Sequence, residues 1–244
     1  MTDSGSTDTL AGLALERRED AGALARALAA RVADALRTAL EARASASLVV
    51  SGGTTPAPMF DALARESLDW SRVGVTLADE RAVPVDDPAS NEAMVRERLL
   101  TGEAARAGFA PLYTADGDLV RAAAGVDALA RPFDVVLLGM GTDGHTASLF
   151  PDAPELERAM NDGGTLLEMH PPSADQTRIT LTRASLADAR ETILHVTGEA
   201  KREVLERAMA EHRERGDAPG VAPIARTLAR ALERGGSVAV WWAP

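Results

Sequence analysis

Several residue types and patterns are missing or scarce in this chain of 244 residues, and each absence narrows the possibilities. Cysteine is absent, so disulfides, thiolate metal ligands and thiol nucleophiles are excluded. Aromatic residues make up only 3% of the chain, so charge and hydrogen bonds, rather than ring stacking, are expected to recognise a ligand. No stretch reaches the roughly 20 apolar residues of a membrane span, and residues 1–9 lack the basic and apolar segments of a signal peptide. We therefore expect a cytoplasmic protein that does not bind membranes.

Positive charge is also in short supply. The 26 Lys and Arg residues are outnumbered by 37 Asp and Glu residues, which gives a net charge of -11. A nucleic-acid partner is not expected, because binding to a phosphate backbone needs a basic surface. Small anionic ligands are compatible with the sequence wherever basic side chains gather locally. Lys201 is the only lysine of the chain.

The N-terminal part of the sequence predicts a tail and a long helix. Residues 1–9 are small, polar and acidic, so we expect a disordered tail, followed by a single α/β domain over residues 10–244. In residues 16–43 apolar side chains recur at every fourth position, which predicts an amphipathic helix packed on a sheet. A coiled-coil seam is the alternative, but it requires alternating spacings of three and four residues. The recurring side chains are Leu24, Leu28, Val32, Leu36 and Leu40.

Short apolar runs alternate with amphipathic segments through the rest of the chain. Such runs without strict alternation are typical of parallel strands that are buried on both faces. The predicted fold is therefore α/β, with three α/β/α layers around a mostly parallel, Rossmann-like sheet. Ligands bind at the carboxyl ends of the strands in such sheets, so function is sought in the loops there. Strands are expected at residues 47–50, 74–78, 111–113, 133–138, 192–196 and 237–241, and helices are expected to begin near residues 56, 90, 118 and 199.

The loop after the first of these strands has the composition of a phosphate-binding turn. Its glycines let the backbone approach a ligand, its hydroxyl groups can donate hydrogen bonds, and its proline favours a helix start whose free amides attract anions. An ordinary strand-to-helix turn has the same composition, so both interpretations stay open. The loop consists of Ser51, Gly52, Gly53, Thr54, Thr55 and Pro56.

Charged residues of both signs follow the second predicted strand, in the sequence Asp79-Glu80-Arg81. Their position at the ligand-binding edge of the sheet favours a functional role, and a solvated loop with a local ion pair is the alternative. Ser90 and Asn91 open the next helix, where Ser90 can act as the N-terminal cap.

The loop after the fourth predicted strand is the most informative. Gly139, Gly141 and Gly144 match the spacing G-x-G-x-x-G of a dinucleotide-binding turn. We reject that interpretation, because Asp143 would place a carboxylate against the pyrophosphate and no second strand carries an acidic residue about 20 positions later. What remains is an imidazole, that of His145, which can act as a general base while Asp143 orients it.

The other histidines are weaker candidates. His195 falls within a predicted strand and is expected to pack inside the sheet, His212 lies on a charged helix, and His170 precedes two prolines in a loop. No pair has the spacing of metal ligands, so neither a metal nor another cofactor is predicted. The G-x-S-x-G pattern of a serine nucleophile is also missing.

Two further basic residues lie near predicted strand ends. Lys201 falls in the first turn of the helix that begins near residue 199, where the helix dipole disfavours a cation unless an anion is nearby. Arg178 begins a predicted strand over residues 178–182, and its side chain could point into the same cleft or into solvent. Both orientations stay open.

In their order and composition, these motifs resemble those of 6-phosphogluconolactonases. The resemblance implies the fold shared with glucosamine-6-phosphate deaminase and ribose-5-phosphate isomerase. It also implies the hydrolysis of 6-phospho-D-glucono-1,5-lactone to 6-phosphogluconate, the second step of the oxidative pentose phosphate pathway, without a metal. The stretch Gly-x-Gly-x-Asp-Gly-His-Thr-Ala-Ser-Leu-Phe-Pro is specific, and the matching segments are residues 51–56, 79–84, 90–91, 139–151, 178–182 and 197–201.

The resemblance further implies roles for individual residues. His145 would be the base that activates water, with Asp143 beside it in the site. The implied phosphate ligands are Ser51, Gly52, Gly53, Thr54, Thr55, Arg81 and Lys201. From their loop positions, we add Asp79, Asn91, Gly141 and Arg178 as possible substrate contacts. The only partner expected is the small sugar-phosphate lactone, bound by a monomer or a small homo-oligomer.

Three other functions fit parts of the sequence. A deaminase of the same fold would need a glutamate at the position of Phe150, in a run resembling Asp-Gly-His-x-Ala-Phe-Asn-Glu. A sugar-phosphate sensor would carry an N-terminal helix-turn-helix, which a short acidic tail and one helix do not supply. A nicotinamide-dependent enzyme would bind that cofactor, which a fluorescence titration would detect.

Overall fold

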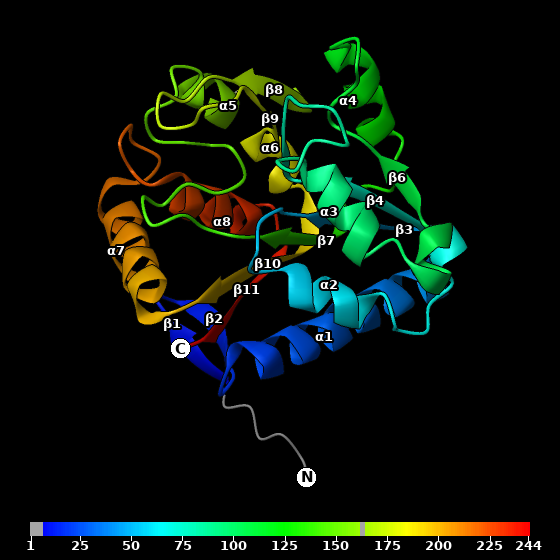
Figure 1. Cartoon of the computed structure of the whole chain (residues 1–244). Helices are drawn as coiled ribbons and strands as arrows, with labels where there is room; N and C mark the ends of the chain where they lie inside the picture. Colours follow the sequence, from blue (N-terminus) through cyan, green and yellow to red (C-terminus); the bar gives the residue numbers. More distant parts are fainter. Residues whose placement is uncertain (1–6, 162–163) are drawn as a thin grey trace.

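A computed structural model describes residues 7–161 and 164–244, and its centre is a large, mostly parallel sheet (Figure 1). Every neighbouring pair in this sheet is parallel except β1 and β2, which are antiparallel. From one edge to the other, its strands are β1 (Thr7–Leu10), β2 (Leu13–Arg17), β11 (Ser237–Ala243), β10 (Ala189–Thr197), β7 (Phe133–Leu138), β3 (Ala46–Val50), β4 (Val73–Leu77) and β6 (Gly108–Ala110).

Helices cover both faces of this sheet (Figure 1). On one face α1 packs against β3, β7 and β11 and against α2; on the other α7 and α8 pack against β10 and each other. The predicted α/β/α layers around a mostly parallel sheet are therefore confirmed. The helices are α1 (Ala21–Ala42), α2 (Ala57–Leu63), α3 (Asn91–Arg98), α4 (Leu119–Asp127), α5 (Leu156–Asn161), α6 (Arg183–Leu186), α7 (Glu199–Arg215) and α8 (Pro223–Glu233), with short 3-10 turns at Trp70–Arg72 and Gly102–Arg106.

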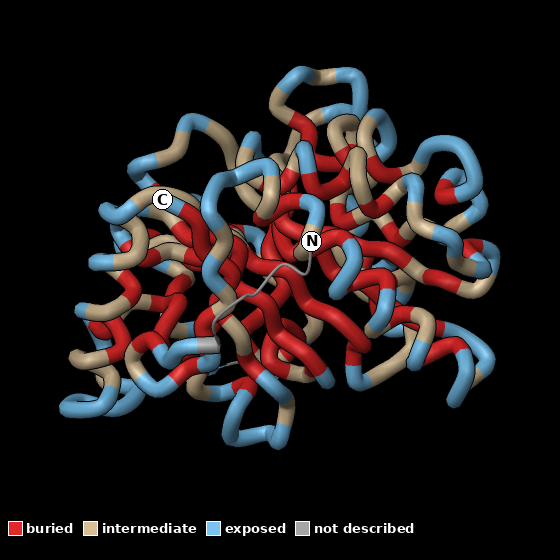
Figure 2. The backbone as a smooth tube through the Cα atoms, turned by 90° about the horizontal axis from the view of Figure 1, so that it is seen from below, coloured by how far each residue is buried: buried red, intermediate tan, exposed pale blue. Residues whose placement is uncertain are grey.

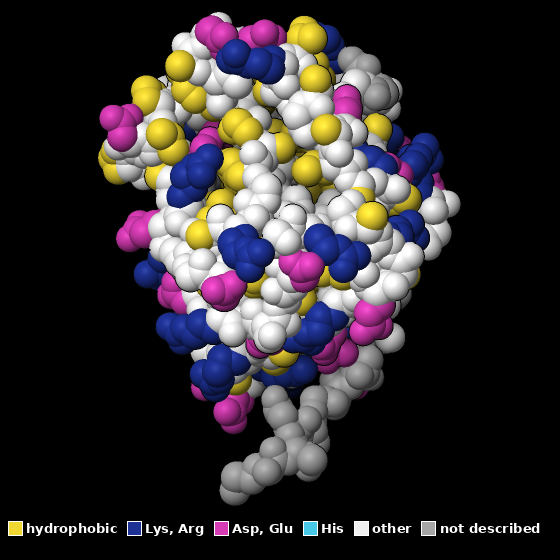
Figure 3. Space-filling model, turned by 90° about the vertical axis from the view of Figure 1, so that its right-hand side faces the viewer, with side chains coloured by type: hydrophobic (Ala, Val, Ile, Leu, Met, Phe, Trp, Pro, Cys, Tyr) yellow, Lys and Arg dark blue, Asp and Glu magenta, His cyan; other side chains and the backbone are white. Residues whose placement is uncertain are grey.

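The core lies between the sheet and its helices, as the buried centre of Figure 2 shows. β7 is buried along its whole length, as expected for a central parallel strand with helices on both sides. The stripe predicted on α1 faces the sheet: Leu24, Leu28, Val32 and Leu36 are fully buried. Around this core, Figure 3 shows basic and acidic side chains interspersed over one face of the molecule.

A second, small sheet was not predicted. It joins β5 (Asp79–Arg81), β9 (Arg178–Leu181) and β8 (Leu166–Met169) in antiparallel order. β9 confirms the strand predicted over residues 178–182, whereas β5 and β8 have only three and four residues and show no clear period in the sequence. The pairing sets Arg81 directly opposite Arg178, although nearly 100 residues of chain separate them.

The N-terminal prediction needs correction. Residues 1–6 of the predicted tail lie outside the described residues, but residues 7–9 are not a disordered tail, because they belong to β1. Ala11 and Gly12 both have positive φ, which is the geometry of the two-residue turn that joins antiparallel strands. Leu10 and Leu13 are buried at this hairpin, so apolar contact offsets the cost of ordering the polar residues before them.

Two element boundaries also differ from prediction. The helix expected over residues 16–43 begins only at Ala21, because Asp20 caps it by accepting a hydrogen bond from the backbone N of Ala23 at 2.8 Å. The strand expected at residues 111–113 lies three residues earlier, as β6, because Pro111 has no N–H to continue the ladder. Among the described residues, no helix has both the length and the apolar composition that a membrane crossing requires.

Candidate active site

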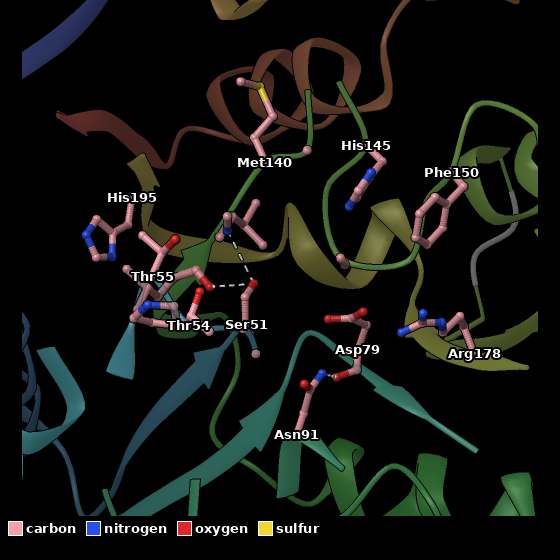
Figure 4. A pocket seen from close by; sticks show the side chains of 18 of the residues that line it. Ser51, Thr54, Thr55, Asp79, Asn91, Met140, His145, Phe150, Arg178 and His195 are labelled. Carbon is pink, nitrogen blue, oxygen red and sulfur yellow. Dashed lines mark hydrogen bonds between the residues drawn. The ribbon is translucent and has the colours of Figure 1, made fainter. Parts of the chain in front are cut away.

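A cavity of about 420 Å³ opens at the carboxyl ends of four adjacent strands, β10, β7, β3 and β4 (Figure 4). The chain passes from β3 through α2 to β4 on one side, and from β7 towards β10 on the other. The strand order therefore reverses between β3 and β7. Open α/β sheets bind their ligands at such a switch point, and the volume is typical of a small-molecule site.

The structure brings almost every predicted site residue to this pocket. Asp143 is the exception, since it contacts His145 but does not line the cavity. Phe150, Met140 and His195 line the pocket without having been predicted to do so. The predicted residues that line it are Ser51, Gly52, Gly53, Thr54, Thr55, Asp79, Arg81, Asn91, Gly141, His145, Arg178 and Lys201.

His145 and Asp143 form a hydrogen-bonded pair at one end of the pocket. Asp143 Oδ1 lies 2.6 Å from His145 Nδ1 and also accepts a hydrogen bond from the backbone N of His145 at 3.1 Å. An ionised carboxylate can only accept, so the proton of a neutral ring lies on Nδ1 and Nε2 is left as its basic atom. The geometry is that of a general base held in one tautomer.

The turn that carries this pair leaves no room for a larger residue. A Cβ placed on Gly141 would lie 2.3 Å from two atoms of the His145 ring. The backbone N of Gly141 donates to the carbonyl of His145 at 2.9 Å, and Thr146 Oγ1 donates to the carbonyl of Gly139 at 2.8 Å. These bonds fix the loop, and so the imidazole, relative to the end of β7.

The ring of Phe150 stacks on the imidazole of His145. The two ring centroids are 4.2 Å apart with 30° between the planes. The guanidinium of Arg178 lies 5.9 Å from the centre of the same phenyl ring. Phe150 therefore presents an apolar face to His145 and supplies no second carboxylate to it.

The glycine loop after β3 is held by its neighbours. The Ser51 hydroxyl donates to the carbonyl of Leu137 at 3.1 Å and accepts from the backbone N of Gly139 at 3.4 Å, so it ties β3 to β7. A Cβ on Gly52 would lie 1.9 Å from Asn91 Oδ1, which makes glycine necessary there. Gly53 has a φ of +97°, a left-handed conformation that glycine adopts without strain.

Glu80, between two predicted site residues, holds the start of α3. Its carboxylate accepts hydrogen bonds from the backbone N of Asn91 and of Glu92, both at 2.7 Å, and from the hydroxyl of Ser90 at 3.2 Å. Burial raises the pKa of Glu80, and the backbone donors partly oppose that effect. Ser90 caps α3 as predicted, by accepting from the backbone N of Ala93 at 3.1 Å.

The same arrangement fixes Asp79 and Asn91 at the pocket wall, where Asp79 lies near Arg178 and on the same side of the pocket as His145 (Figure 4). Asn91 Nδ2 donates to the carbonyl of Asp79 at 2.9 Å, and the hydroxyl of Ser148 donates to Asp79 Oδ2 at 2.5 Å. One oxygen of the Asp79 side chain is thus occupied by the protein. The other, Oδ1, has no hydrogen bond within the described part of the chain.

Positive charge gathers in this pocket despite the acidic composition. Arg81, Arg178 and Lys201 line it, against the single carboxylate of Asp79. The Nε atoms of Arg81 and Arg178 are buried and have no partner among the described residues. Burial and then the charge of Arg81 lower the pKa of Arg178, as expected for two guanidinium groups held together. Arg178 therefore points into the cleft, which decides between the two orientations left open by the sequence.

Lys201, in the first turn of α7, and His195, in β10, both line the pocket. No hydrogen bond or ion pair of Lys201 is found in residues 7–161 and 164–244, so its ammonium is available to a ligand. Burial, and then the charge of Lys201, lower the pKa of His195 to about 4. His195 does lie buried in the sheet as expected, but its side chain also forms part of the pocket wall.

The fold and the pocket together define an α/β protein whose pocket is lined by three basic side chains and by one histidine of a histidine–carboxylate pair. Across residues 7–161 and 164–244, no three His, Asp or Glu side chains gather in a way that would hold a metal ion.

The chain belongs to the family of glucosamine-6-phosphate isomerases and 6-phosphogluconolactonases, whose family model matches residues 19–234. It is 47% identical to the 6-phosphogluconolactonase of Pseudomonas aeruginosa over 84% of this chain and 89% of that protein. It is 44% identical to the enzyme of the same name from Rhizobium meliloti, over 93% of this chain and 97% of that one. The crystal structure of a 6-phosphogluconolactonase from Shewanella baltica matches it with a TM-score of 0.86 and 38% identity, covering 99% of this chain and 100% of that chain.

Proposed function

We propose that this protein hydrolyses 6-phospho-D-glucono-1,5-lactone to 6-phospho-D-gluconate. The observation that carries the proposal is the His145–Asp143 pair, which leaves Nε2 of a fixed imidazole at the wall of a cationic pocket. The relatives and the solved structure that match most of the chain carry the name 6-phosphogluconolactonase, which supports the same substrate.

The proposed reaction needs one base and no covalent nucleophile. His145 Nε2 takes a proton from water as the water oxygen attacks C1, and the carbonyl electrons move to the exocyclic oxygen. Backbone amides of the glycine turns stabilise that oxyanion. When the oxyanion collapses, the bond from C1 to the ring oxygen breaks and the imidazolium returns its proton to that oxygen. Asp143 keeps the ring in the reactive tautomer and stabilises its charged form.

The phosphate of the substrate anchors C1 near the base. Lys201, Arg81 and the loop of residues 51–55 are the proposed phosphate ligands, because they supply charge and donors to one cavity. Binding energy from this distant group raises the rate by orienting the reacting carbon, even though the phosphate itself does not react.

Phe150 favours lactone hydrolysis over deamination. In the deaminase-like motif, a glutamate at this position would provide a second carboxylate near the imidazole. Here a phenyl ring stacks on His145 with centroids 4.2 Å apart, so Asp143 is left as the carboxylate that contacts the ring. A proton relay through a carboxylate at position 150 is therefore not available.

The test is lactone hydrolysis above the spontaneous rate, with the lactone generated in situ by glucose-6-phosphate dehydrogenase and acid release followed in a weak buffer. We expect the wild-type protein to accelerate hydrolysis and His145→Ala to lose at least about 100-fold in kcat, the usual contribution of a general base. The matched control is His170→Ala, because His170 is an exposed histidine outside the pocket that pairs with Glu155. A folded wild-type protein without activity would refute the proposal, and ammonia release from glucosamine 6-phosphate would then be measured.

The proposal includes a reaction without metal or cofactor, a cytoplasmic location and a monomer or small homo-oligomer. If the reaction needs no metal, the protein should keep its full activity after treatment with a chelator. Sedimentation at several protein concentrations measures the oligomeric state.

A further inference from the structure

His195 is a polar residue of the pocket for which the proposed mechanism has no use. It lies near the carboxyl end of β10, which pairs with β7 on one side and β11 on the other. Leu194 and Val196 beside it are fully buried, and His195 itself is only 4% exposed. Such positions normally hold aliphatic residues, because a polar ring loses its hydration there. An imidazole in this place therefore needs a compensating partner.

The protein does not supply that partner. No side-chain hydrogen bond of His195 is found in the described part of the chain, and its Nδ1 is fully buried without one. A proton on Nδ1 would be a buried donor with no acceptor, which is rarer in proteins than a buried acceptor without a donor. The neutral ring therefore carries its proton on Nε2, the nitrogen that remains accessible at the pocket wall.

The surroundings of His195 indicate what this donor meets. In Figure 4, His195 and Thr55 lie toward one end of the pocket, whereas His145 and Phe150 lie toward the other. The ammonium of Lys201 is close enough to act on the ring electrostatically. No carboxylate among the pocket-lining residues lies at this end, since Asp79 is held by Ser148 on the side of His145 and Arg178 (Figure 4). A cation and a neutral donor that line one pocket and act on each other electrostatically can together bind an anion.

We infer that His195 is a phosphate-recognising residue whose Nε2–H donates a hydrogen bond to a phosphate oxygen of the substrate, beside Lys201. This inference rests on the proposed function, because it takes the phosphate end of the lactone to lie opposite His145. The uncharged imidazole gives the phosphate a directional hydrogen bond in addition to the charge of Lys201, and being neutral it does not repel that ammonium. His195 thus determines specificity for the phosphorylated lactone and takes no part in the proton transfers at C1.

The experiment compares three variants at one position. Glutamine places its amide nitrogen where His195 has Nε2, asparagine places it where His195 has Nδ1, and valine has no donor. We expect His195→Asn and His195→Val to raise KM for the lactone by about 10- to 100-fold, the range for a lost hydrogen bond to a charged group, with kcat changed less than threefold. His195→Gln should bring KM back to within about threefold of wild type, because it restores the donor.

Inorganic phosphate is the second probe, and its Kd is measured by calorimetry for each folded variant. The Kd is expected to rise with KM in His195→Asn and His195→Val and to recover in His195→Gln. If the three variants have the same KM, or if all lose kcat rather than affinity, the inference is wrong. If the phosphate Kd values of wild type and the three variants follow this pattern but wild type does not hydrolyse the lactone, the proposed function fails while His195 remains a phosphate ligand. If wild type hydrolyses the lactone and His195→Val binds phosphate normally, the inference alone fails.

Discussion

The burial of His195 predicts a specific loss of stability in acid. Its pKa is lowered from 6.5 to about 4, chiefly because the ring loses its hydration in the sheet. Between these two values the unfolded chain binds a proton that the folded chain does not, so the free energy of unfolding falls as the pH falls. The effect is absent well above pH 6.5 and is complete below about pH 4.

The size of this effect follows from the two pKa values. Their difference corresponds to a total loss of about 3 kcal/mol in the free energy of unfolding once the pH is below both values, and about 2 kcal/mol of this is lost between pH 7 and pH 5. The loss is large compared with the total stability of a typical domain.

Urea denaturation of wild type and His195→Gln at pH 7 and pH 5 measures the effect. The fluorescence of Trp70, Trp241 and Trp242 reports unfolding, because all three rings are buried in the folded protein. Wild type should lose about 2 kcal/mol more than His195→Gln between the two pH values. Glu80, whose pKa is raised by burial, acts in the opposite direction but is common to both proteins and cancels in the comparison.

A matched control separates burial from the mere presence of a histidine. His170 is half exposed, and its hydrogen bond with Glu155 raises its pKa, so His170→Gln should not reduce the acid loss. The reasoning would be refuted if His195→Gln and wild type lost the same free energy between pH 7 and pH 5. It would also be refuted if His170→Gln gave the larger reduction.

Three further predictions concern the pocket and its support. Asp143→Asn should lower kcat for the lactone by about 100-fold or more with a much smaller change in KM, because the amide no longer fixes the His145 tautomer. Steady-state kinetics at neutral pH tests this, and equal kcat values for the variant and wild type would contradict it. Gly141→Ala should reduce kcat by a similar factor in a protein that still folds, because the added Cβ would lie 2.3 Å from the His145 ring; circular dichroism and the same assay separate misplacement from unfolding. Glu157→Gln should lower the free energy of unfolding by about 2 kcal/mol or more, because it leaves the guanidinium of Arg226, which is 1% exposed, without its carboxylate partner. Urea denaturation measures this change in free energy, and a change below the error of the method would show that the ion pair is dispensable.

Local patterns in the sequence were sufficient for much of the fold and the site. The period-four stripe on α1 and the continuous apolar run of β7 predict elements that depend on burial of their own side chains. Glycine, proline and charged residues directly after such strands identify the loops at the ligand-binding edge. Because the carboxyl ends of parallel strands meet at one edge, residues from four separate loops are expected to share one pocket, and the structure confirms this for nearly all of them.

Errors arose where a segment depends on a distant partner. Residues 7–9 form a strand because β2 adds to β11 near the other end of the chain, and the polar composition of the segment gives no sign of that partner. In the small sheet, β9 was predicted as a strand, but β5 and β8 are too short to show a period, and their pairing with β9 joins segments that are far apart in the sequence.

What the sequence alone determined is therefore the class of fold, most strands of the main sheet and most of the residues at the ligand edge, all of which follow from spacing along the chain. What only the tertiary structure decided is how those residues face one another. The sequence left open whether the side chain of Arg178 points into the cleft or into solvent. The structure pairs Arg178 with Arg81 in the small sheet, and its side chain lines the pocket. His195 reads as an ordinary strand residue, and only the opening of the pocket beside β10 and the approach of Lys201 give its ring a ligand-binding position. Side-chain direction and electrostatic environment depend on contacts between segments far apart in sequence, and those contacts exist only once the chain has folded.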